Sequence, residues 1–78
     1  MIEFFAVVYE NNGQVYIYVN PTGFINLTES PSLAFDGLFT VKMLAGTLYH
    51  TVLANGMYSG LHSKIQLRKF TLNLMPLD

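Results

Sequence analysis

The sequence predicts an all-β domain, a small antiparallel meander that forms a sandwich or a barrel-like sheet. Short turn signals rich in Asn and Gly recur along its 78 residues. The segments between these turns are rich in aromatic and β-branched residues, which favour strands. The expected strands are residues 3–10, 14–19, 24–27, 38–44, 47–54 and 64–75, with turns at 11–13, 20–23, 45–46 and 55–56 and one long connection at 28–37.

The first two strands form the most clearly specified hairpin. Asn12-Gly13 suits a type I′ turn, in which both central residues need a positive φ that Asn and Gly tolerate best. A loop of these two residues sets the register, so that Tyr9 faces Tyr16 across the hairpin.

Both faces of this hairpin are apolar, although one face of an antiparallel sheet commonly meets water. One face carries small and branched side chains, namely Phe4, Ala6, Val8, Val15, Ile17 and Val19. The other is aromatic and carries Phe5, Val7, Tyr9, Tyr16 and Tyr18. Three interpretations stay open for Phe5, Tyr9, Tyr16 and Tyr18: the rest of the domain covers them, they form a subunit or partner interface, or they stack on nucleic-acid bases.

Residues 38–55 allow a second reading. Apolar side chains recur there at helical spacing, with Thr40, Thr47 and Thr51 on the opposite side. Gly46 and the run of Thr, Val, Tyr and His disfavour a helix. The prediction therefore stays with strands, and the alternative is an α+β fold with one helix at about 38–55 packed on an antiparallel sheet.

The carboxy-terminal strand changes parity, because Ile65 and Leu67 occupy odd positions whereas Phe70 occupies an even one. A bulge near Arg68-Lys69 would bring both sets to one face. Three of the four cations also gather within six residues here. They are either the charges that protect an edge strand or part of an anion-binding site, for which the candidate residues are Ser59, His62, Ser63, Lys64, Arg68 and Lys69.

No motif for catalysis or metal binding is present. The chain has no cysteine, which excludes disulfides and thiolate zinc sites. A hairpin turning on Asn55-Gly56 would place His50 and His62 on opposite sides, and no carboxylate lies near either in sequence. We therefore expect no enzyme, no metal and no cofactor.

The composition points to association. Charged residues are 12% of the chain, against a typical value of about 25%, and a core this small usually needs disulfides, a metal or oligomerisation. We expect a homo-oligomer. A net charge of −1 disfavours nucleic acid as a partner without excluding it. No apolar run approaches the roughly 18 residues of a membrane span, so we expect a cytoplasmic protein without membrane contact, in the cytoplasm of the host cell if the chain is viral.

These observations lead to one functional expectation and two alternatives. The expectation is a non-enzymatic binding protein, a small β-rich homo-oligomer that recognises a protein partner or a small ligand, including an anionic one. Its size and lack of motifs suit an inhibitor or sequestering factor of a phage or mobile element. The alternatives are a single-stranded nucleic-acid-binding protein and a structural or assembly component of a virion.

Overall fold

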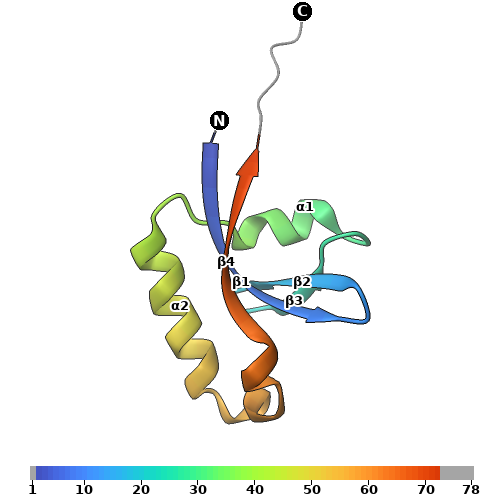
Figure 1. Ribbon diagram of the computed structural model, residues 1–78, viewed down its shortest axis with the longest axis vertical. Helices are drawn as coiled ribbons and strands as arrows, with labels where there is room; N and C mark the ends of the chain where they lie inside the picture. The colour runs from blue at the N-terminus through green and yellow to red at the C-terminus, as the bar shows by residue number, and fades with distance from the viewer. Residues whose placement is uncertain (1, 73–78) are drawn as a thin grey trace, which may run out of the picture.

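A four-stranded antiparallel sheet in the order β3-β2-β1-β4 lies between helices in the computed structural model (Figure 1). The structure describes residues 2–72. Its strands are β1 (Ile2–Asn11), β2 (Gln14–Val19), β3 (Gly23–Asn26) and β4 (Ile65–Leu72). Its helices are α1 (Pro31–Ala34) and α2 (Lys42–Ala54), with two 3₁₀ helices, η1 (Phe35–Gly37) and η2 (Gly56–Lys64).

The β1–β2 hairpin forms as the sequence predicts. Asn12 and Gly13 have φ of 52° and 77°, as a type I′ turn requires. Asn11 pairs with Gln14 and Tyr9 with Tyr16, which is the predicted register. The second predicted turn, at residues 20–23, joins β2 to β3.

The all-β prediction is wrong, and the α+β alternative with a helix near residues 38–55 is the fold that forms. Helix α2 replaces the predicted strand 47–54 and the last three residues of the predicted strand 38–44, and before it Phe39 forms only an isolated bridge to Phe5. Ala45, Leu48 and Val52 are buried, as expected for residues three or four positions apart on one face of a helix. The hydroxyls of Thr47 and Thr51 donate to the carbonyls four residues earlier, at 3.0 Å each, so these poor helix formers are satisfied inside the helix.

The predicted hairpin at Asn55-Gly56 is wrong as well. Asn55 ends α2 and begins η2, and its side-chain oxygen accepts the N–H of Met57 at 3.0 Å. A short polar side chain that binds a nearby backbone N–H is as useful between two helices as in a hairpin turn. The expected long connection at 28–37 contains α1 and η1.

The predicted bulge near Arg68-Lys69 does not form. The register of β4 against β1 runs without interruption from Tyr9–Ile65 to Ile2–Leu72. The change of parity has another cause, which is that both faces of the sheet are covered. The part of the predicted strand after residue 72 lies outside the described residues.

Two hydrophobic clusters fill the two interfaces between the sheet and the helices. On one face α2 and η2 pack on the aromatic side of the hairpin, in a cluster built on Val7, Tyr18, Leu48, Val52 and Ile65. On the other face α1 and η1 pack on the small side chains, in a cluster built on Ala6, Val8, Ile17 and Ala34. Figure 1 shows α2 and α1 on opposite sides of the sheet.

Candidate functional site

The aromatic residues singled out in the sequence lie on the face that α2 and η2 cover. Tyr18 is buried, with 8% of its surface exposed. Its ring centroid lies 5.2 Å from that of Phe24 and 5.8 Å from that of Tyr58, both edge to face. Burial raises the pKa of Tyr18, and the neighbouring Tyr58 raises it further. Tyr18 is thus part of the core and offers no open ring for stacking.

The other aromatic candidates are half-buried and are divided between two ends of the face. Tyr9 and Tyr16 lie together at the hairpin, with ring centroids 5.6 Å apart. Phe5 lies further along β1, where its backbone pairs with that of Phe39. The structure does not join Phe5, Tyr9, Tyr16 and Tyr18 into one exposed surface.

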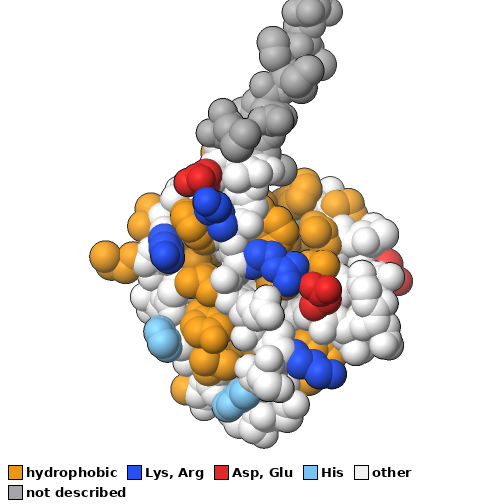
Figure 2. All heavy atoms as spheres, in the orientation of Figure 1, with side chains coloured by type: hydrophobic (Ala, Val, Ile, Leu, Met, Phe, Trp, Pro, Cys, Tyr) orange, Lys and Arg blue, Asp and Glu red, His pale blue; other side chains and the backbone are white. Residues whose placement is uncertain are grey.

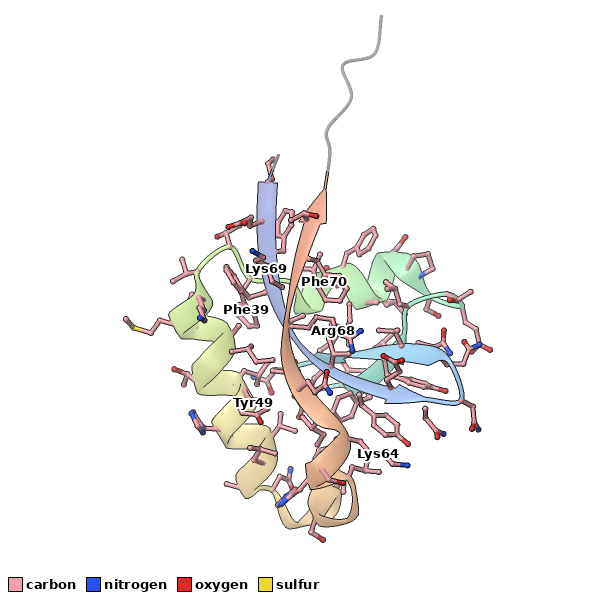
Figure 3. The ribbon with its side chains drawn as sticks, in the orientation of Figure 1. Phe39, Tyr49, Lys64, Arg68, Lys69 and Phe70 are labelled. Carbon is pink, nitrogen blue, oxygen red and sulfur yellow. The ribbon has the colours of Figure 1, made fainter. Side chains whose placement is uncertain are left out.

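The candidate anion-binding residues also separate. Ser59, His62, Ser63 and Lys64 are exposed on η2, whereas Arg68 and Lys69 belong to β4 and point to opposite faces of the sheet. Figure 3 shows the Lys69 side chain on the α2 side of β4 and the Arg68 side chain on the other. Arg68 binds the Glu10 carboxylate at 2.9 Å, and Lys69 binds that of Glu3 at 3.2 Å. The structure does not bring the six residues around one anion.

The structure contains a pocket that the sequence did not predict. It has a volume of about 320 Å³ and lies between the α1–η1 segment and the sheet. Its lining consists of Ile17, Leu27, Pro31, Phe35, Leu38 and Phe70. Phe35 is 50% exposed at this pocket, and Leu33 of the same helical segment is 57% exposed.

Small residues on the α1–η1 segment bring it close to the sheet beside the pocket. Ala34 is completely buried. A Cβ added to Gly37 would collide with the carbonyl oxygen of Tyr18 and lie 2.6 Å from Cγ2 of Ile17. The larger Phe35 and Leu38 flank this close contact, and the pocket lies among them. One feature of the sequence could have predicted the helix beside the pocket: Pro31 follows Ser30, a pair typical of the first turn of a helix.

The chemistry of the pocket is limited to apolar contact. All six lining side chains are apolar, so none can transfer a proton or attack a substrate. Within residues 2–72 no three His, Cys, Asp or Glu side chains gather as metal ligands would. None of the helices in the same range has the length and apolar character needed to span a bilayer.

Comparisons with protein-family models, with curated proteins and with solved structures found no match to this chain.

Proposed function

We propose that the chain is a non-enzymatic binding protein whose pocket receives an apolar side chain of a protein partner. The open, apolar pocket is the observation that supports this proposal. Its volume of about 320 Å³ exceeds that of a cavity of roughly 150 Å³ that holds benzene. It also reaches the lower end of the range of about 300–1,000 Å³ found for ligand sites.

The lining favours an apolar side chain over a polar metabolite. A polar ligand entering this pocket would lose its hydrogen bonds to water and gain none from the six lining side chains. The exposed side chains of Leu33 and Phe35 extend the apolar surface outside the pocket. A protein surface can cover such an extension while one of its side chains fills the hollow.

The pocket can be tested with N-acetyl-tryptophanamide, which carries an aromatic side chain between two peptide groups. Its binding is followed by the amide NMR shifts of the folded protein. We expect saturable shifts around Phe35 and Leu38, and we expect Leu38→Phe to abolish them by filling the pocket. Leu53→Phe is the matched control, since Leu53 is a half-buried residue packed in the cluster under α2. Equal binding by the two variants would contradict the proposal.

We further propose that the protein assembles as a homo-oligomer. Support comes from the low charged fraction of 12% and from the exposed apolar side chains Leu33, Phe35, Val41, Met43, Leu44 and Met57. Assembly stabilises the folded chain by mass action, so the melting temperature should rise with protein concentration. Sedimentation as a stable 8.8 kDa monomer at micromolar concentration would exclude this assembly.

The proposal does not extend to single-stranded nucleic acid. Stacking on bases needs exposed rings beside a cationic groove. Tyr18 is buried against Phe24 and Tyr58, and Arg68 and Lys69 are bound to carboxylates. The positions of these residues therefore support neither an exposed ring for stacking nor a cationic groove.

A further inference from the structure

Alternate residues of β4 direct their backbone N–H and C=O groups toward its outer edge, and the pairing of Phe5 identifies which residues these are. Phe5 donates its N–H to the carbonyl of Phe39 at 2.7 Å and accepts the N–H of Phe39 at 2.8 Å. Both backbone groups of Phe5 therefore point away from β4. Lys69 lies directly opposite Phe5. At a pair of this kind the backbone groups of both residues point outward, so those of Lys69 face the free edge.

The same direction holds for every second residue of β4. Leu67 and Thr71 also direct their N–H and C=O groups outward, whereas Gln66, Arg68 and Phe70 bond to β1. The N–H of Ile65 is already bound to the carbonyl of Leu61. Within residues 2–72, no backbone hydrogen bond from outside the sheet reaches Leu67, Lys69 or Thr71. In Figure 1 this strand lies in front of β1, with α2 on one side and α1 on the other.

Cationic side chains flank this edge. Lys64 precedes β4, and Arg68 and Lys69 lie within it. Figure 2 shows blue side chains spread over this face of the molecule, with red ones next to some of them. Glu10 and Glu3 lie on the same side, bound to Arg68 and Lys69. Three cations and two carboxylates leave this side with a net charge of +1, in a chain whose net charge is −1. In Figure 3 Phe39 and Tyr49 lie on the α2 side of β4, and Phe70 lies on the other side.

We propose that the free edge of β4 accepts an extended, acidic segment of a partner protein as an added antiparallel strand. Backbone bonds to Leu67, Lys69 and Thr71 would hold the segment. Its carboxylates would meet Lys64 and would add a second carboxylate to Arg68 and Lys69, whose side chains stay 32% and 54% exposed beside Glu10 and Glu3. A second copy of β4 is a poorer occupant in the registers that bring its own cations together. An antiparallel self-pairing centred on Arg68 or on Lys69 would place identical cations directly opposite each other, which destabilises a strand pair.

The test uses two short, acetylated and amidated peptides with the isotope-labelled protein. In one peptide Glu alternates with Val or Thr, and in the other Lys replaces every Glu. We expect only the Glu peptide to bind. At a concentration ten times its Kd it should slow hydrogen exchange of the Leu67, Lys69 and Thr71 amides by about tenfold. Binding should weaken with added salt, because exposed charges are screened.

Variants separate the backbone contribution from the charge. Lys69→Pro removes an outward N–H together with the cation, without removing a bond to β1, and we expect it to bind the peptide at least about fivefold more weakly than Lys69→Gln does. Lys69→Gln keeps that N–H and should weaken binding by up to about fivefold, as expected for an exposed ion pair. Lys42→Gln, which removes a cation from α2 rather than from β4, is the matched control and should change nothing. Leu38→Phe should also leave peptide binding intact, since it alters only the pocket.

Four results would overturn the inference. The first is equal binding of the Lys peptide. The second is peptide-induced shifts confined to the pocket. The third is protection of the three amides in the protein alone that grows with protein concentration, which would place a second copy on the edge. The fourth is protection of these amides by a single-stranded oligonucleotide and not by the Glu peptide.

Discussion

Gly37→Ala should loosen the packing of the α1–η1 segment against the sheet. The added methyl would collide with the backbone carbonyl of Tyr18 and lie 2.6 Å from Cγ2 of Ile17. Carbon atoms pack at about 3.5–4.0 Å, so η1 must move away by about 1 Å. Because one obstacle is backbone rather than the end of a flexible side chain, the sheet cannot simply yield. Overpacking of this kind typically costs about 1–3 kcal/mol of unfolding free energy.

Gly46→Ala is the matched control, because it adds the same methyl to the other helix. A Cβ at Gly46 meets no atom within 4 Å, and Gly46 lies in the middle of α2. Ala is favoured over Gly by about 0.8–1.0 kcal/mol in a helix interior. The two substitutions should therefore change the unfolding free energy in opposite directions.

Urea denaturation gives both unfolding free energies, and thermal melting gives an independent measure. For a domain of this size 1 kcal/mol corresponds to about 4–8 °C in melting temperature. We expect Gly37→Ala to melt well below the parent protein and Gly46→Ala to melt above it. An unchanged melting temperature for Gly37→Ala would show that η1 does not contact the Tyr18 carbonyl, and the geometry assigned to the pocket would fail with it.

Two further predictions concern ionisable groups. The pKa of Tyr18 is raised by burial and by Tyr58, whereas a tyrosine in the unfolded chain ionises near pH 10. The unfolding free energy should therefore fall as the pH rises above about 10. Tyr18→Phe should reduce this slope in denaturation measured from pH 9 to 11, and an unaltered slope would exclude Tyr18 as its source. The Arg68–Glu10 ion pair has side chains 32% and 50% exposed, so Glu10→Gln should cost less than about 1 kcal/mol at low salt. A cost that persists in 1 M salt would contradict this assignment.

The parts of the fold that the sequence predicts correctly are those set by local geometry. Asn12-Gly13 allows few turns other than a type I′ hairpin, and the turn then fixes the register of Tyr9 against Tyr16. By contrast, the local helix propensities gave the wrong prediction for the residues of α2. Thr47 and Thr51 are weak helix formers, but tertiary burial of Leu48 and Val52 outweighs a preference of a few tenths of a kcal/mol per residue.

The parity change in β4 illustrates what a single strand cannot reveal. Leu67 and Phe70 lie on opposite faces because helices cover the sheet on both sides. A bulge and a three-layer arrangement give the same apolar pattern along one strand. The helical assignment of residues 31–37 and 42–54, which cover the two faces of the sheet, distinguishes them. The pocket escaped prediction for a related reason, since its six lining residues come from β2, β4 and the segment between residues 27 and 38.

The pairing of β1 with β4 has a consequence for the order in which the fold can form. The β1–β2 hairpin involves neighbours in sequence, and such hairpins close within about 1–10 μs. The pairing of Phe5 with Lys69 joins distant parts of the chain. Closing the long loop between them costs entropy before the contacts on either side can stabilise the pair. On a ribosome β1 therefore has an unpaired edge until residues 65–72 emerge. Throughout that interval this strand presents unpaired backbone groups, which can pair with the strands of other chains.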